Sequence, residues 1–380
     1  MHILIAPNAF KHSLNAEKAA SAIQEGLRRS RLAHTSNCFP IGDGGDGTAA
    51  LIIRQCKGNI KELIVTDPIG RKIQASYGLI DSGQTAVIEM ANASGIQLLK
   101  PGELKPLGAN SFGTGELIRS AVEHGARKIV IAMGGSATID GGVGILQALG
   151  ARFMDNDQKE LLTIPADLTA LASADLSGID QRLLQCEITV ICDVDNFLLG
   201  SHGSAAIFGP QKGASADDIK ILNAGLARLA HIALQQTGKD MTTVKYGGTA
   251  GGAAAGLYAF LNAKLVNGID HFLSLTNFDV VLNYANLVIT GEGSIDEQTL
   301  KGKGPFGVAA QARQRKIPVI ALAGKIPLEQ HTGLLDYFDA LLPIGNEPTD
   351  LDRAIACTES NLIRTAETLG NLLALKIHGF

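Results

Sequence analysis

Two carboxylates lie three residues apart in a segment that is otherwise mostly glycine. Residues 42–48 are Gly-Asp-Gly-Gly-Asp-Gly-Thr, which places Asp43 and Asp46 on a backbone with little Cβ crowding. Such a pair suits Mg²⁺, because Mg²⁺ takes one or two protein carboxylates together with phosphate oxygens of a substrate. The alternative is a turn in which one aspartate caps the following helix. The residues alone leave both interpretations open.

A second glycine-rich segment, residues 134–142, is suited to an anion. Its sequence is Gly-Gly-Ser-Ala-Thr-Ile-Asp-Gly-Gly, between an expected strand and an expected helix. Gly134 and Gly135 let backbone N–H groups approach an anion, and the helix N-terminus adds a favourable dipole. Ser136 and Thr138 add hydroxyl donors. The segment is neither a Walker A loop nor a G-x-G-x-x-G fingerprint. It predicts a phosphate site, with a tight strand-to-helix turn as the alternative.

Further acidic residues follow other expected strands. Asp193 and Asp195 come directly after an apolar run at 188–192. Alternate residues of an extended segment point the same way, so both could face a cation, or one could act as a base. An Asx turn is the alternative. Glu292 lies between two glycines after the run 287–290, which suggests a contact with a metal or a hydroxyl group.

Lysines accompany these acids. Lys11 lies one loop after the first expected strand, where its ammonium could meet a carboxylate or a phosphate. Lys301 and Lys303 follow Glu292 and could neutralise phosphate, and Lys212 stands in a Gly-Pro-Gln-Lys-Gly frame. For each of them, an ordinary solvated lysine is the alternative.

Apolar runs that feed helices must position these residues. Such runs lie at 3–6, 128–133, 188–192, 287–290 and 318–323. Uninterrupted apolar strands followed by helices indicate parallel sheets and an α/β architecture. Ligands in such folds bind beyond the carboxyl ends of the strands, where the residues above are found.

The segment 61–90 differs, because it predicts three strands (62–66, 73–79 and 85–89) without helices between them. We interpret this meander as the entry into another domain. We therefore expect two α/β domains. Residues 1–66 plus 285–380 would form a discontinuous flavodoxin/Rossmann-like domain with a parallel sheet, and residues 67–284 an inserted mixed α/β domain.

Composition excludes several classes of protein. The 380 residues are 46% hydrophobic and carry a net charge of −4, which indicates a globular chain and excludes dominant disorder. No basic excess is present for a nucleic-acid partner. Five scattered cysteines without a C-x-x-C pair argue against a disulfide scaffold or a zinc ribbon and fit a reducing cytoplasm. The longest uncharged run, 246–263, contains five glycines and is a poor membrane span. The chain opens on a strand rather than a leader pattern, so we expect a cytoplasmic protein.

Taken in order, the motifs resemble the glycerate kinase family of the bacterial type I. The resemblance rests on seven ordered motifs that span the chain from residue 3 to about 375. They lie at 6–11, 43–48, 111–118, 134–142, 192–196, 209–213 and 290–303.

This resemblance implies an ATP- and Mg²⁺-dependent kinase for D-glycerate, with direct in-line phosphoryl transfer and an active site in the cleft between two α/β domains. The family product is 2-phosphoglycerate, although 3-phosphorylation or a related small hydroxy acid stays open. On this basis we assign contacts with the ATP phosphates to Gly134, Gly135, Ser136, Thr138 and Lys303. We assign the Mg²⁺ ligands to Asp43, Asp46, Asp195 and Glu292. Asp193 would accept the proton of the attacking hydroxyl, and Lys11 would bind the glycerate carboxylate or the transferring phosphate.

The sequence departs from the family pattern at several positions. Asn8 replaces the common Asp, Ile139 the usual Asn and Ser294 the usual Arg. Asn8 and Ser294 keep a non-enzymatic alternative open, a sugar-acid-binding regulator derived from the kinase. A Rossmann-type dehydrogenase is a further alternative, which the lack of a clean dinucleotide fingerprint disfavours. We expect neither a membrane nor a nucleic-acid partner, and a homodimer is plausible.

Overall fold

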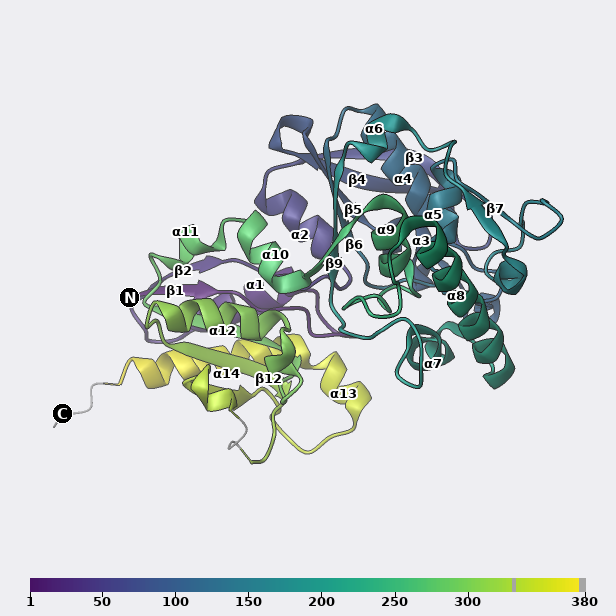
Figure 1. Cartoon of the computed structure of the whole chain (residues 1–380). Helices are drawn as coiled ribbons and strands as arrows, with labels where there is room; N and C mark the ends of the chain where they lie inside the picture. Colours follow the sequence, from purple (N-terminus) through teal and green to yellow (C-terminus); the bar gives the residue numbers. More distant parts are fainter. Residues whose placement is uncertain (330–332, 376–380) are drawn as a thin grey trace. The chain divides into compact units, whose positions relative to one another are not determined.

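The computed structural model describes residues 1–329 and 333–375 (Figure 1). The chain divides into two compact units. The first unit contains residues 1–43 and the chain from Gly268 onward, and the second contains residues 44–267. Both units hold a sheet with helices, so the expected class of two α/β domains is confirmed. Among the described residues, no helix combines the length and the apolarity that crossing a bilayer requires.

The first unit is built on a five-stranded sheet whose strands are all parallel. In chain order the strands are β1 (His2–Ile5), β2 (Thr35–Cys38), β11 (Leu287–Ser294), β12 (Val319–Lys325) and β13 (Ala340–Pro343). Across the sheet they run β2-β1-β11-β12-β13. Numbered within the unit, this is the 2-1-3-4-5 order of flavodoxin-like folds, in which ligands bind where the strand order reverses. That reversal lies at the β1–β11 pair.

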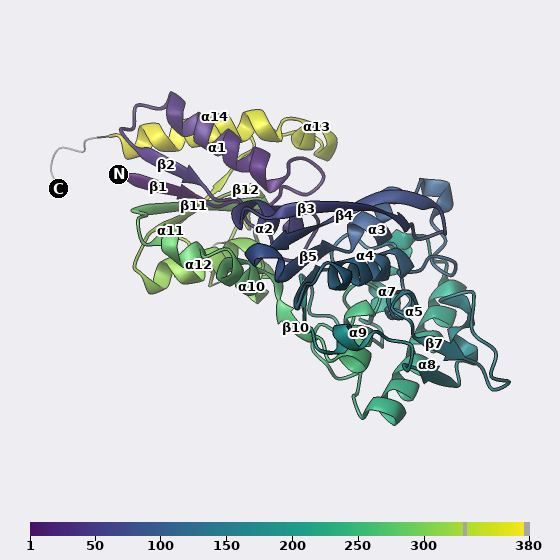
Figure 2. The same ribbon diagram turned by 90° about the horizontal axis from the view of Figure 1, so that it is seen from above.

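Helices cover both faces of this sheet (Figure 2). The first unit contains α1 (Ala16–Arg29), α10 (Gly268–Leu275), α11 (Phe278–Leu282), α12 (Gly304–Gln314), α13 (Leu351–Ala356) and α14 (Thr358–Leu373). Helix α1 begins where the Asn15 side chain accepts a hydrogen bond from the Lys18 N–H. It packs tightly on α14, since a Cβ at Gly26 would lie 2.2 Å from the Ile363 carbonyl oxygen. Only glycine permits this helix–helix approach.

The second unit contains a mixed six-stranded sheet and a small antiparallel sheet of two strands, β7 (Arg152–Met154) and β8 (Ser173–Asp175). The large sheet has the order β10-β9-β6-β5-β4-β3. Its strands are β3 (Asn59–Thr66), β4 (Lys72–Ile80), β5 (Thr85–Glu89), β6 (Lys128–Ala132), β9 (Glu187–Cys192) and β10 (Lys264–Asn267). Strands β3 and β4 pair antiparallel, and β5, β6, β9 and β10 are parallel.

Eight helices are described in the second unit, and all of them except α2 contribute buried side chains to one large apolar core that they share with the sheet. They are α2 (Thr48–Gln55), α3 (Ala91–Ser94), α4 (Phe112–Glu123), α5 (Val143–Ala148), α6 (Gln181–Leu184), α7 (Ser204–Phe208), α8 (Ala216–Thr237) and α9 (Ala253–Leu261). The expected meander is present as β3, β4 and β5.

The unit boundaries differ from the expected ones at 66/67 and 284/285. Strand β3 pairs with β4 along its whole length, so residues 59–66 belong to the second sheet. At the other boundary, Ile269 packs against Gly307 of α12, and Phe278 makes an edge contact with Phe39. Tertiary pairing places these segments, and their local composition carries no signal of it.

Candidate active site

In the first unit, polar residues gather where β1 and β11 end. The Asn8 N–H donates to the Gly291 carbonyl at 2.8 Å, which holds the loop after β1 against the end of β11. The Asn8 amide also donates to Asp43 Oδ2 at 2.8 Å. An aspartate at position 8 would need a proton to make that bond. Asn8 therefore orients Asp43 without adding a second negative charge.

Glu292 is the buried acid of this cluster, with 8% of its surface exposed. Thr299 Oγ1 donates to its Oε1 at 3.0 Å. Burial raises the pKa of Glu292 to about 7, and the charge of Asp43 acts in the same direction. Lys303, the Thr299 hydrogen bond and Lys11 oppose that rise. Asp43, Lys11 and Lys303 therefore all lie close enough to Glu292 to influence its charge.

Helix α12 begins at this cluster, with Lys303 at its N-cap. A Cβ at Gly304 would lie 2.8 Å from the Asn8 amide nitrogen, so the start of the helix lies directly against the loop after β1. The first unit thus brings together four of the predicted site residues, Lys11, Asp43, Glu292 and Lys303. Two carboxylates can hold a divalent cation, and two ammonium groups can hold an anionic substrate.

In the second unit, the loop before α2, the loop after β6 and the loop after β9 pack closely against one another at glycines. The Gly134 N–H donates to the Gly44 carbonyl at 3.0 Å. A Cβ at Gly135 would lie 2.1 Å from Asp46 Oδ1, so the Asp46 carboxylate packs directly on this glycine. A Cβ at Gly44 would lie 3.1 Å from the Asp193 nitrogen. Asp46, the loop after β6 and the loop after β9 are therefore neighbours.

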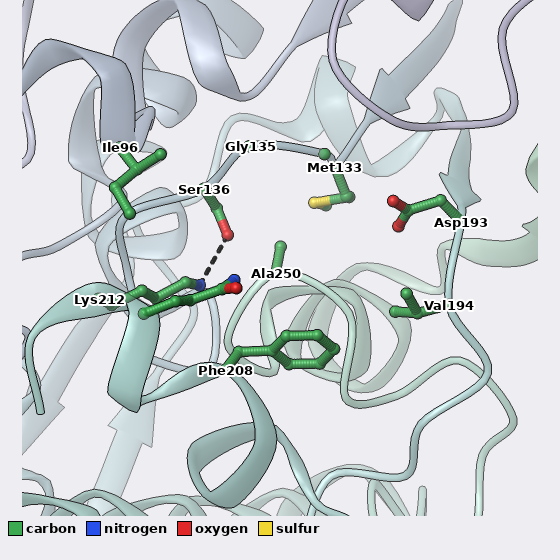
Figure 3. A pocket seen from close by; sticks show the side chains of 11 residues that line it. Ile96, Met133, Gly135, Ser136, Asp193, Val194, Phe208, Lys212 and Ala250 are labelled. Atoms are coloured by element: carbon green, nitrogen blue, oxygen red, sulfur yellow. Dashed lines mark hydrogen bonds between the residues drawn. The ribbon is translucent and has the colours of Figure 1, made fainter. Parts of the chain in front are cut away.

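These loops border a pocket of about 460 Å³, part of which is open to solvent (Figure 3). Ser136 and Lys212 lie on one side of the pocket, and Asp193 and Val194 lie across from them. Lys212 Nζ donates to Ser136 Oγ at 2.9 Å and to the Thr138 carbonyl at 2.8 Å. The remaining lining residues are Ile96, Met133, Gly134, Gly135, Phe208, Gln211 and Ala250.

Lys212 is unusual among lysines that line a pocket, because only 3% of its surface is exposed. Burial lowers its pKa to about 7, and the charge of Asp140 opposes this only in part. Asp140 is fully buried and already accepts hydrogen bonds from the N–H and hydroxyl of Ser111 and from the N–H groups of Gly142 and Gly144. The Asp140 carboxylate therefore holds the glycine-rich turn before α5 through these hydrogen bonds and makes no direct bond to Lys212 in the structure.

Glu89 anchors the loop that carries Asp46. Its two carboxylate oxygens accept hydrogen bonds from the Gly47 N–H at 2.7 Å and the Ala49 N–H at 2.9 Å, at the start of α2. Burial raises the pKa of Glu89 to about 7, the two backbone hydrogen bonds oppose this, and the charge of Asp46 adds to it.

Two predicted residues lie apart from these clusters. Thr138 does not line the pocket, and its buried Oγ1 has no hydrogen-bond partner among the described residues. Asp195 is exposed and lies near Lys245, whose pKa is raised mainly by Tyr246 and to a smaller extent by the charge of Asp195. Of the four predicted metal ligands, Asp43 and Glu292 belong to the first unit, and Asp46 and Asp195 belong to the second. Within the described residues, no three Asp, Glu, His or Cys side chains are grouped to share a metal ion.

Several residues that line the pocket or hold its loops were not among the predicted site residues. Lys212 stood out in the sequence only as a lysine in a glycine frame, and Glu89 carried no signal beyond its place at a strand end. Ala250 belongs to a glycine-rich segment, 247–252, whose only feature in the sequence was its unsuitability as a membrane span. There the Gly141 N–H donates to the Gly251 carbonyl at 3.0 Å, so this segment and the loop after β6 pack backbone to backbone. The clustering of its glycines was the available signal.

Comparisons with known proteins agree with this architecture. The profile of the glycerate kinase family matches residues 3–374. The chain is 40% identical to a glycerate kinase of Bacillus subtilis, over 99% of this chain and 98% of that protein. It is 41% identical to the glycerate 2-kinase of Escherichia coli, over 99% and 98% of the two chains. A Salmonella typhimurium LT2 crystal structure, provisionally assigned as a glycerate kinase 2, superposes with a TM-score of 0.83 at 41% identity, covering 98% of each chain.

The matched family and these relatives are kinases, so the chain is a kinase. The likenesses extend over almost the whole length of the compared chains. The chain belongs to the glycerate kinase family.

Proposed function

We propose that this kinase transfers the γ-phosphoryl group of ATP to D-glycerate, with 2-phosphoglycerate as product. The observation that carries the proposal is the match to the family over residues 3–374, together with a relative named glycerate 2-kinase at 41% identity. The physical character of the two clusters supports it. One offers carboxylates and lysines, and the other offers a glycine-rich pocket with a buried lysine.

Mg²⁺ fits the carboxylates that are present. Asp43 and Glu292 supply only oxygen donors, which Mg²⁺ prefers. Burial opposes the ionised form of Glu292, and a bound cation would offset that cost. We assign Asp43 and Glu292 as ligands, with Asp46 and Asp195 as the further candidates. When bound, the ion would neutralise charge on the phosphoryl group in transfer.

The protein's own groups would divide the remaining work. Gly134, Gly135 and Ser136 would hold ATP phosphates in the pocket. The Thr138 carbonyl would accept the hydrogen bond from Lys212. The glycerate hydroxyl oxygen forms the new bond to the γ-phosphorus as the bond to the ADP oxygen breaks. Asp193, on the pocket wall, would accept the hydroxyl proton. Lys11 would bind the glycerate carboxylate or the transferring phosphate.

A coupled assay tests the reaction and its product together. Purified protein receives ATP, Mg²⁺ and D-glycerate, and enolase with pyruvate kinase and lactate dehydrogenase reports 2-phosphoglycerate. We expect D-glycerate-dependent turnover without added phosphoglycerate mutase. Turnover that requires the mutase would identify 3-phosphoglycerate as the product. Glycerate binding without any turnover would favour a regulator that has lost kinase activity.

The setting of the reaction is part of the same proposal. All five cysteines are free thiols, which supports a reducing cytoplasm where ATP is available. The homodimer stays a prediction, and light scattering of the purified protein would test it.

A further inference from the structure

Lys212 is held rigidly at the wall of the pocket. It ends the short 3₁₀ turn Pro210–Lys212 between α7 and α8, and Gly213 follows with φ +89°. A Cβ at Gly213 would lie 2.3 Å from the Leu104 carbonyl oxygen, and one at Gly209 would lie 2.3 Å from the Ala205 carbonyl oxygen. The two glycines therefore fix the backbone on both sides of the lysine. A long side chain held in this way is available for binding at a small entropic cost.

The charge of Lys212 is poorly compensated by the protein. An ammonium group has three hydrogens, and two of them are donated to Ser136 Oγ and the Thr138 carbonyl, which are both neutral acceptors. The carboxylate of Asp140 influences Lys212 through its charge but is bonded to other donors. A buried cation without a bonded counter-ion is costly, and an anion in the adjoining pocket would relieve that cost.

The bond from Lys212 also dictates how Ser136 acts. An ammonium group can only donate, so Ser136 Oγ is the acceptor in this pair. The Ser136 hydroxyl hydrogen is then directed away from Lys212 and is available to a ligand. Because Lys212 also donates to the Thr138 carbonyl, it holds two acceptors of the segment that follows Gly135, the Ser136 hydroxyl and the Thr138 carbonyl. One side chain thus orients the hydroxyl and supplies the charge.

We propose that Lys212 binds a phosphoryl oxygen of the nucleotide in this pocket and orients Ser136 to donate to the same phosphate chain. This inference rests on the proposed function, since it concerns how the kinase holds its phosphoryl donor. The apolar lining by Ile96, Val194 and Phe208 favours a nucleotide over glycerate as the occupant. Glycerate is a small, entirely polar molecule and would leave these side chains without a partner.

Calorimetric titration of ADP into the wild type and Lys212→Met tests the inference directly. Methionine keeps most of the length of the side chain and removes its charge. We expect ADP to bind about 10- to 100-fold more weakly, the loss typical of a hydrogen bond to a charged group. The affinity for D-glycerate should stay within about twofold of the wild type, and the salt dependence of ADP binding should become shallower. Lys220→Met, on the exposed face of α8, is the matched control and should bind ADP as the wild type does.

A second variant keeps the test decisive if Lys212→Met does not fold. Ser136→Ala leaves the buried lysine in place and removes the oriented hydroxyl, so ADP should bind severalfold more weakly. Unchanged ADP affinity in either folded variant would overturn the inference, as would a loss confined to D-glycerate. If the inference fails in this way but the wild-type protein still phosphorylates D-glycerate, the proposed function stands. A wild type that neither binds ADP nor turns over D-glycerate would overturn both.

Discussion

Glu292 and Glu89 occupy corresponding places in the two units, and they differ in what meets the carboxylate. Each lies at the carboxyl end of a parallel strand, is at most 8% exposed, and has a pKa that burial raises to about 7. Glu292 meets side chains, with a hydrogen bond from Thr299 and the charges of Lys303 and Lys11 nearby. Glu89 meets the backbone N–H groups of Gly47 and Ala49.

This difference supports the binding role that we propose for Glu292 and a structural role for Glu89. Backbone N–H groups cannot leave their place without unfolding the start of α2, so the Glu89 oxygens are committed to the loop. The side chains around Glu292 can rotate and exchange partners when a ligand arrives. Burial and a raised pKa are therefore common to both acids, and the kind of hydrogen-bond donor is what distinguishes their roles.

Asp193 tests whether the second unit also contains a carboxylate that acts in the chemistry. In Asp193→Asn, kcat with D-glycerate should fall by roughly 10²–10⁴-fold, the usual cost of losing a general base. The affinity for ADP and the melting temperature should change little, because the amide keeps the shape of the side chain. Turnover close to that of the wild type would show that the proton leaves by another route.

The variants Glu292→Gln and Glu89→Gln test whether the first glutamate binds Mg²⁺ and the second only holds a loop. In Glu292→Gln, the Mg²⁺ concentration for half-maximal turnover should rise by roughly tenfold or more, since one charged contact is lost. In Glu89→Gln it should stay near the wild-type value. Titration of Mg²⁺ at saturating ATP and D-glycerate measures both variants. Equal shifts in the two variants would remove the distinction between ligand and anchor.

Gly134→Ala tests how closely the loops of the second unit must pack. The new Cβ would lie 2.5 Å from the Gly45 Cα, and this backbone has little room to move. We expect a loss of about 1–3 kcal/mol in the free energy of unfolding. Gly102→Ala is the control, because a Cβ added there would meet no heavy atom within 4 Å. Chemical denaturation of both variants decides the matter, and similar losses would contradict the packing argument.

The pH dependence of stability shows the smallest effect. The pKa of Glu89 rises from 4.5 to about 7 on folding, so the native state binds a proton more tightly than the unfolded state. Its stabilising contribution is complete below pH 4.5 and is lost as the pH rises toward 7. In Glu89→Gln, the fall in unfolding free energy between about pH 5 and 7.5 should be smaller by about 1–2 kcal/mol. Denaturation curves at several pH values measure it, and parallel profiles for variant and wild type would contradict the assignment.

The α/β class and the strand ends that carry polar residues were predictable from the sequence, because apolar runs and glycine clusters are local signals. Asp43, Glu292, Lys11 and Lys303 stood out in the sequence by type and position, and the first unit brings them together. The burial and the long-range hydrogen bonds of Glu89 and Lys212 were not predictable, since neither leaves a local pattern. The unit boundaries differed from the expected ones for the same reason, as β3 joins its sheet by pairing with β4.

The sequence by itself determined the family of this protein, its parallel strands and the glycine-rich loops at their ends. These depend on residue types and on their order along the chain. Tertiary structure alone decided which carboxylate meets side chains and which meets the backbone. It also placed Lys212, 76 residues after Ser136 in the chain, within hydrogen-bonding distance of that hydroxyl. The physical reason is that burial and long-range hydrogen bonds set the charge and the freedom of a polar group, and both arise only when distant segments pack together.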